Sequence, residues 1–187
     1  RRTADSSPAP MRRAGPTSGG HGSEGSERSA VEPELAADRG RAAVYAAEVA
    51  AFDGTSAERV GTIDEMVSLA DWVASASWWP RGPVAVVRRR ADARSSVTCQ
   101  AGSEDPVIRL APPQLTPATV AHELAHVLAG VTHGHDRVFR RAHVDIVGQV
   151  IGSHAVGWLD DAYAAYGLDI GERHWPTPPS PPRAIAL

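Results

Sequence analysis

The sequence predicts an α+β fold in which a small antiparallel three-stranded sheet packs on about five helices, between disordered termini. Two observations support this expectation. Apolar residues recur at helical spacing in five segments, and three short runs rich in Val and Ile lie between the second and third of these segments. The length of 187 residues fits a single domain.

Both ends of the chain are poor in apolar residues. Residues 1–30 are rich in Ser, Gly, Pro and Arg, and residues 176–187 repeat prolines. Segments of this composition bury too little apolar surface to offset the entropy lost when they become ordered. We therefore expect a disordered N-terminal arm over 1–30, one domain over 31–175 and a Pro-rich disordered tail over 176–187.

The first two helices and the sheet come from the first part of the domain. An Ala-rich helix is predicted over 33–54, where Asp-Gly ends it, and a second helix over 62–80, where a proline stops it. The strands are predicted at 83–90, 95–100 and 106–111, and their order along the chain suggests an antiparallel meander. If the last strand lies at an edge, a peptide substrate could add to it as a further strand.

Three more helices follow the strands. The first is predicted from Thr116 to Gly130, because threonine suits the N-cap, proline the first helical position and glycine the end. The second is predicted over 136–152, with an aspartate as its N-cap, and the third over 155–171.

The helix after Thr116 contains HELAH, a match to the motif HExxH. His122 and His126 are four residues apart, so both imidazoles leave one helix face a turn apart. This spacing suits one Zn²⁺ at about 2.0–2.1 Å from each nitrogen. Glu123, beside the first ligand, can take a proton from water at the metal and pass it to the leaving amine.

Chance is a weak explanation for this motif. A shuffled chain of the same composition would contain about 0.02 such matches. The alternative is a purely structural helix, buried in the core, whose histidines form hydrogen bonds only to the backbone. The motif lies within a helix and further histidines follow the helix end, so we expect a zinc site with Glu123 as general base.

The third zinc ligand has several candidates. The extended motif HExxHxxGxxH fails, because Ala129 and Thr132 stand at the required Gly and His positions. A glutamate ligand on a later helix is also disfavoured, because Glu172 lies in the C-terminal loop region. We prefer His135, because Phe139 follows one turn later and can anchor the turn that presents the histidine.

Other ligands stay open beside His135. His133 lies on the same loop, and Asp136 and Asp145 offer carboxylates. His143 would lie about 12 Å further along the helix axis than His135, so it suits the same ion poorly. His154 is expected in a loop, and a site without a third protein ligand is a further alternative.

Charge and composition limit the expected partners. The 19 basic and 22 acidic residues give a net charge of −3, which predicts no strong nucleic-acid binding. The lone Cys99 excludes an internal disulfide and a cysteine zinc cluster. The chain has no apolar run of 18 residues and no secretory signal, so we expect a cytoplasmic protein that does not enter membranes. It starts at Arg1 rather than Met, which leaves room for a native start further upstream.

The stretch AHELAHVLAG, followed by HGHDRVF, resembles the SprT-like and WLM groups of zinc peptidases. In these groups a histidine follows HExxH after a short loop, and an aromatic residue comes four positions later, as in His135 and Phe139. The wider layout is similar to a family of small actinobacterial HExxH metallohydrolases, with VYAAE in the first helix, Trp-Pro before the first strand and AYAAYGL near the end. The similarity covers Arg41 to Leu168.

This resemblance implies a zincin-like domain and a zinc hydrolase, specifically a metallopeptidase with peptide or protein substrates. It implies His122, His126 and His135 as zinc ligands and Glu123 as catalytic base. The actinobacterial family often has His-Gly-Pro before the aromatic residue, whereas this chain has His-Asp-Arg, closer to the WLM form. Two alternative functions stay open: a protease acting on DNA-associated proteins, and a protein in which zinc only stabilises a partner-binding fold. The sequence does not indicate an oligomeric state.

Overall fold

The computed structural model describes residues 31–99 and 105–180 and shows the predicted α+β fold. The predicted N-terminal arm and residues 181–187 lie outside the described residues. The helices are α1 (Val31–Phe52), α2 (Ile63–Ala74), α3 (Pro117–Ala129), α4 (Arg137–Val150) and α5 (Ser153–Ala165). The strands are β1 (Ala85–Arg88), β2 (Ser96–Cys99) and β3 (Pro106–Leu110), and the short 3-10 helices are η1 (Ser56–Glu58), η2 (Pro112–Gln114) and η3 (Val131–His133).

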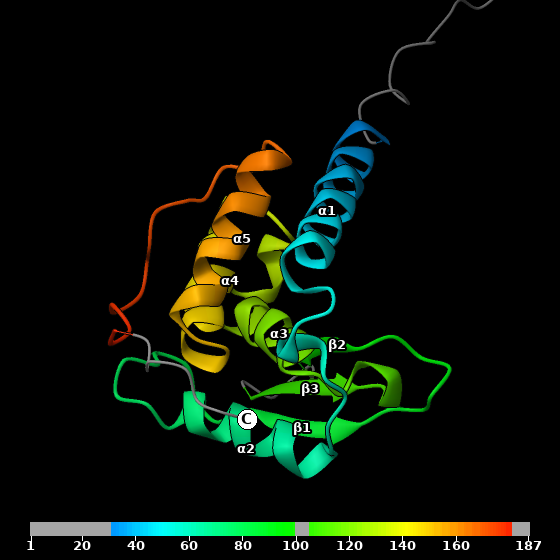
Figure 1. Ribbon diagram of the computed structural model, residues 1–187, viewed down its shortest axis with the longest axis vertical. Helices are drawn as coiled ribbons and strands as arrows, with labels where there is room; N and C mark the ends of the chain where they lie inside the picture. The colour runs from blue at the N-terminus through cyan, green and yellow to red at the C-terminus, as the bar shows by residue number, and fades with distance from the viewer. Residues whose placement is uncertain (1–30, 100–104, 181–187) are drawn as a thin grey trace, which may run out of the picture.

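Helix α3 lies at the centre of the molecule (Figure 1). It packs against α4 on one side and contacts the sheet and α2 on the other. Helices α1, α4 and α5 pack together on the side of α3 that faces away from the sheet, and α2 lies along β1. The central position explains why α3 is almost wholly buried, including both polar residues that open its motif, His122 and Glu123.

The two helices that carry the motif region begin where the sequence predicts. Thr116 caps α3 by accepting a hydrogen bond from the backbone N–H of Thr119, and Gly130 ends the helix with φ of 100°, a value that L side chains rarely adopt. Asp136 caps α4 by accepting from the backbone N–H groups of Val138 and Phe139 at 2.8 and 3.1 Å. The caps fix both ends of the short connection between α3 and α4.

Two helices end earlier than predicted. Helix α2 stops at Ala74, and the chain then turns so that the adjacent Trp78 and Trp79 are both buried, with ring centroids 5.9 Å apart. Helix α5 stops at Ala165 because Gly167 adopts φ of 66°, which closes the helix end. Apolar periodicity alone continued through both ends and could not locate these turns.

The prediction of an antiparallel meander is wrong. The strand order is β1-β3-β2, with β2 antiparallel to β3 but β1 parallel to β3. Strands that follow one another usually pair, but here β2 occupies one edge of β3 and β1 the other. The segment 89–105, which includes β2, is long enough to make the crossover that a parallel pair needs. Contact between β1 and α2 accompanies this order.

The same order corrects the expectation that the strand before the motif helix lies at an edge. Strand β3 is central, and its backbone pairs with β1 along one side and with β2 along the other. A peptide therefore cannot add to β3 as a further strand. The two edges of the sheet belong to β1 and β2.

The segment after α5 runs back along α4 and is fixed to it by Asp145. This buried carboxylate accepts hydrogen bonds from the guanidinium of Arg173 at 2.7 and 2.8 Å and from the indole N–H of Trp175 at 2.9 Å. Further along, Gln149 donates to the backbone carbonyl of Pro179 at 2.9 Å. Asp145, a candidate metal ligand in the sequence, thus holds the C-terminal segment against α4.

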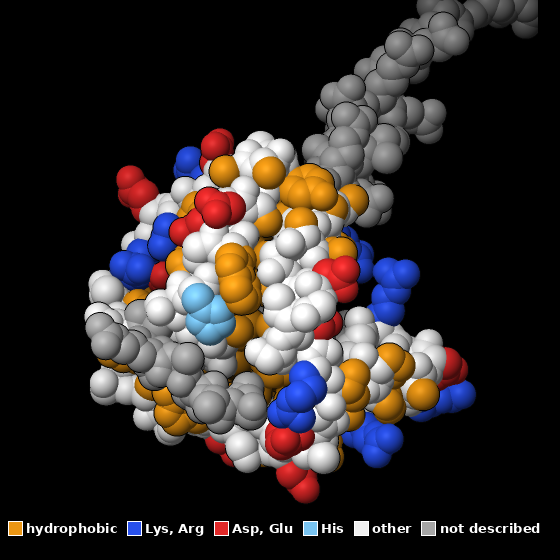
Figure 2. Space-filling view, viewed as in Figure 1, with side chains coloured by type: hydrophobic (Ala, Val, Ile, Leu, Met, Phe, Trp, Pro, Cys, Tyr) orange, Lys and Arg blue, Asp and Glu red, His pale blue; other side chains and the backbone are white. Residues whose placement is uncertain are grey.

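Acidic and basic side chains are intermingled on the face of the molecule shown in Figure 2, around apolar side chains on α1 and α5. Among the described residues on this face, positive charge forms no extended surface of the kind that binds a phosphate backbone. Within residues 31–99 and 105–180, every helix is too short or too polar to cross a membrane.

Candidate metal centre

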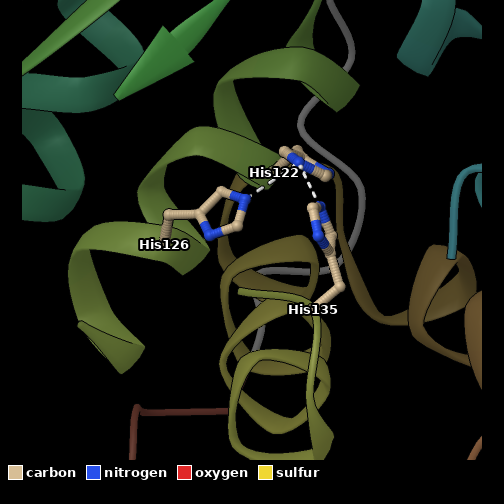
Figure 3. Close-up of side chains that lie close together, drawn as sticks. All are labelled: His122, His126 and His135. Atoms are coloured by element: carbon tan, nitrogen blue, oxygen red, sulfur yellow. Dashed lines mark hydrogen bonds between the residues drawn. The ribbon is translucent and has the colours of Figure 1, made fainter. Parts of the chain in front are cut away.

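Three histidines from two neighbouring segments converge on one point (Figure 3). His122 and His126 lie on α3, and His135 lies in the turn between η3 and α4. The Nε2 atom of His122 is 3.2 Å from Nε2 of His126 and 3.3 Å from Nε2 of His135. One ring nitrogen from each histidine lies within 4.8 Å of the other two, so the group could hold a metal ion.

The spacing of these nitrogens fits Zn²⁺. With Zn–N distances of about 2.0–2.1 Å, two ligands of a tetrahedral site lie about 3.3–3.4 Å apart. The separations of 3.2 and 3.3 Å around His122 are close to this value. Among the residues whose side chains the structure describes, 40–97 and 105–180, no fourth His, Cys, Asp or Glu joins the three histidines. The donor set therefore fits a zinc ion with three protein ligands.

The apolar ring of Phe139 packs against all three imidazoles. Its ring is fully buried, and its centroid is 4.3 Å from that of His126, 4.9 Å from that of His135 and 5.1 Å from that of His122. The turn that carries His135 is also held by Arg140, which donates to the His135 backbone carbonyl at 2.8 Å. The predicted anchoring of this turn by Phe139 is seen in the structure.

Four other candidates for the third ligand lie outside this group of three histidines. Nδ1 of His133 is 2.9 Å from Oδ2 of Asp136, whose other oxygen caps α4. Asp145 binds the C-terminal segment. The expectation that His154 lies in a loop is wrong, because α5 begins at Ser153, and the His154 ring contacts Trp158 with centroids 4.9 Å apart. The structure therefore brings His135, and none of these four, to the two histidines of α3.

Glu48 contacts the site and was not predicted from the sequence. Its Oε1 atom is 2.5 Å from Nδ1 of His122 and 3.4 Å from Nδ1 of His143. These three residues form a second group of side chains that could hold a metal ion. His143, predicted to lie too far from His135 to share its ion, lies next to His122 with ring centroids 5.7 Å apart.

The sequence does contain a signal for Glu48. Val44 and Phe52, one helical turn before and after it on α1, are both buried. Glu48 is therefore a single carboxylate on the apolar face of an Ala-rich helix. A charge in such a position is costly unless it has a buried partner. The pattern indicates that a partner exists, although it does not identify His122.

Burial and neighbouring charge determine which histidines are neutral. Burial, together with the charge of His122, lowers the pKa of His126 to about 2 and that of His135 to about 4. Burial also disfavours the charged form of His122, but the charge and hydrogen bond of Glu48 outweigh this effect and raise the pKa of His122. His122 is therefore the first of the three to take up a second proton as the pH falls.

Glu123 is a buried carboxylate beside His122. Burial raises the pKa of Glu123, while the charge of His122 and a hydrogen bond from the backbone of Val97 act in the lowering direction. A general base is most effective when its pKa lies near the working pH. Burial therefore moves the pKa of Glu123 upwards, towards the range in which a carboxylate can act as a general base. Because Val97 belongs to β2, an edge strand of the sheet contacts this carboxylate directly.

A cavity of about 310 Å³ opens beside His122 and Glu123. Residues of α1, η1, η2, α3 and the loop before β2 line it. Tyr45 of α1 is 39% exposed, and its ring stacks on that of His122, with ring centroids 5.3 Å apart and ring planes 14° apart. The guanidinium of Arg41 lies 5.5 Å from the centroid of the Tyr45 ring. A substrate in this cavity would lie next to Glu123.

The affinity for zinc should fall as the pH is lowered. If Zn²⁺ is the ion, it has to displace the Nε2 proton of His122, whose pKa is raised, so affinity should drop about tenfold per pH unit below that pKa. His126 and His135 add to this loss only near pH 2 and pH 4, because their pKa values are already low. Zinc dissociation constants measured between pH 5 and 8 should show the release of one histidine proton. Release of two or more near pH 6 would contradict this assignment.

Comparisons of the chain with protein-family models, curated proteins and solved structures found no match. The similarity to the SprT-like, WLM and small actinobacterial families remains a prediction from the motif.

Proposed function

We propose that this protein is a zinc-dependent metallopeptidase, with His122, His126 and His135 as metal ligands and Glu123 as general base. The meeting of three imidazole nitrogens beside a buried glutamate carries the proposal. Structural zinc sites are usually closed by four protein ligands, whereas catalytic sites keep one position open. The three-histidine donor set among the described residues favours catalysis over a purely structural role for zinc.

In the proposed reaction, Glu123 transfers the proton and the three histidines hold the metal. When bound, Zn²⁺ would polarise the substrate carbonyl and acidify water. Glu123 would take a proton from the attacking water as the new C–O bond forms, and would give that proton to the leaving nitrogen as the C–N bond breaks. The burial that raises the pKa of Glu123 strengthens it as a proton acceptor.

The cavity beside Glu123 supports a peptide substrate. Its volume of about 310 Å³ is at the lower end of the roughly 300–1,000 Å³ typical of ligand pockets, which gives room for one side chain and its adjoining backbone. Its lining combines the aromatic ring of Tyr45, the apolar Val49 and charged groups such as Arg94. Such a mixture suits a side chain next to a peptide bond.

Removal and return of the metal test this proposal. The full chain, purified with one zinc ion per molecule, should cleave members of a mixed peptide library, with the products identified by mass spectrometry. A chelator should abolish cleavage, and stoichiometric Zn²⁺ should restore it. Cleavage that persists in the zinc-free protein, or a zinc-loaded protein that cleaves no peptide, would overturn the assignment.

A further inference from the structure

We infer that Glu48 is a positioning residue for the zinc ligand His122, and that His143 and Tyr163 hold Glu48 in place. This inference rests on the proposed zinc function and extends the site from α3 and its following turn to α1, α4 and α5. It gives a role to Glu48, a largely buried carboxylate that lies outside both the expected motif and the group of three histidines that could hold the metal.

The contact between Glu48 and His122 fixes the direction of the imidazole. Oε1 of Glu48 lies 2.5 Å from Nδ1 of His122, and the two side chains are 16% and 6% exposed. A carboxylate accepts a hydrogen bond, so Nδ1 of His122 carries the proton in this pair. The lone pair that could bind metal is then on Nε2, the atom that faces His126 and His135.

His143 lies near the same oxygen of Glu48 that His122 contacts, and Tyr163 contacts His143. Nδ1 of His143 is 2.7 Å from the Tyr163 hydroxyl and 3.4 Å from Oε1 of Glu48, and both rings are fully buried. Among the described residues, Nε2 of His143 has no hydrogen-bond partner. In the part of the chain that the structure describes, this ring therefore makes its polar contacts through Nδ1, the atom near Glu48, which places α4 and α5 against the glutamate of α1.

A bound zinc ion would give this buried carboxylate a function beyond stability. A carboxylate that accepts the second N–H of a ligating histidine fixes the ring and increases its basicity, and its loss typically costs about 10–100-fold in metal affinity or activity. Removing one partner of a buried ion pair usually destabilises the fold, because the other group loses its partner. A purely structural role for Glu48 therefore predicts lower stability alone, whereas a positioning role predicts weaker zinc binding by protein that is still folded.

The test measures zinc affinity and metal-free stability in matched variants. E48Q keeps the shape and a hydrogen-bond acceptor but removes the charge, while D53N removes an exposed carboxylate just after the end of the same helix. In competition with a chromophoric chelator, E48Q should bind zinc about 10–100-fold more weakly than the wild-type protein, and D53N should match the wild type. The metal-free form of E48Q should be less stable than the wild type but still folded at the temperature of the titration, as far-ultraviolet circular dichroism checks, so that unfolding does not account for the loss of affinity.

A second pair of variants tests the support for Glu48 without changing it. Y163F removes the hydroxyl that contacts His143, whereas Y166F alters an exposed tyrosine at the end of α5. Y163F should weaken zinc binding in the same direction as E48Q but by a smaller factor, and Y166F should not. If E48Q fails to fold, this pair decides, because equal zinc affinity in Y163F and Y166F would overturn the inference.

The outcomes separate this inference from the proposed function. Zinc binding of equal strength in wild type and E48Q would refute the positioning role while leaving the metallopeptidase proposal intact. Failure of the wild-type protein to bind zinc would overturn the proposed function and this inference with it. Peptide cleavage is not needed to distinguish these results.

Discussion

Replacing Glu123 with glutamine should remove peptide hydrolysis while leaving one zinc ion per chain. Glutamine has nearly the same shape but cannot take up the proton, so kcat should fall by about 10²–10⁴-fold. Zinc should remain, because Glu123 is not among the side chains whose ligand atoms converge on the metal position. Zinc content and cleavage of one identified peptide, measured on the same preparation, check both parts of this expectation.

Glu172→Gln provides a control for the change of charge, because Glu172 is exposed on the C-terminal segment. This variant should keep both zinc and activity. If Glu123→Gln loses its zinc, Glu123 is a ligand and not a base. If it keeps zinc and cleaves at the wild-type rate, another group accepts the proton.

The parts of the site that could be predicted depend on contacts that are local in sequence. The spacing of His122 and His126 within one helix places them on one face, whatever the rest of the fold. The caps at Thr116 and Asp136 and the glycines between them then limit the course of the turn that carries His135. Phe139 completes the pattern, because its burial brings that turn to the first helix.

The contact with Glu48 could not be predicted in the same way, because it joins residues 74 positions apart. Helical periodicity shows that Glu48 shares a face with Val44 and Phe52, and so that it needs a partner. It does not show that α1 packs where His122 faces it. Such a partner depends on the packing of whole helices, which no short segment determines.

The strand order and the contacts of Asp145 could not be predicted for the same reason, because both depend on residues that are far apart in the sequence. Composition predicts where the strands lie, but the side of β3 on which β1 pairs depends on the long crossover and on packing against α2. Asp145 had the chemistry of a metal ligand, yet Arg173 and Trp175, far along the chain, satisfy its carboxylate. Chemical type indicates that a buried polar group needs a partner, and tertiary packing selects it.

The third ligand can be tested by replacing two nearby histidines in turn. His135→Ala should weaken zinc binding by more than the roughly 10–100-fold expected for loss of a supporting residue, because one of three ligand nitrogens is removed. The turn should keep its course, since Arg140 bonds to the backbone carbonyl of His135 and not to its side chain. Zinc affinity by chelator competition, with far-ultraviolet circular dichroism to check folding, measures this loss.

His133→Ala is the matched control, two residues away in the same turn. Its imidazole pairs with Asp136 at the surface, where the side chains are 39% and 47% exposed, and such pairs contribute about 0–1 kcal/mol to stability. This variant should therefore fold and bind zinc much as the wild type does. In the reverse result, His133→Ala would lose the metal and His135→Ala would keep it. The turn would then have to rearrange on zinc binding so that His133 takes the position of His135. That result would show that the convergence of His122, His126 and His135 is not the metal site.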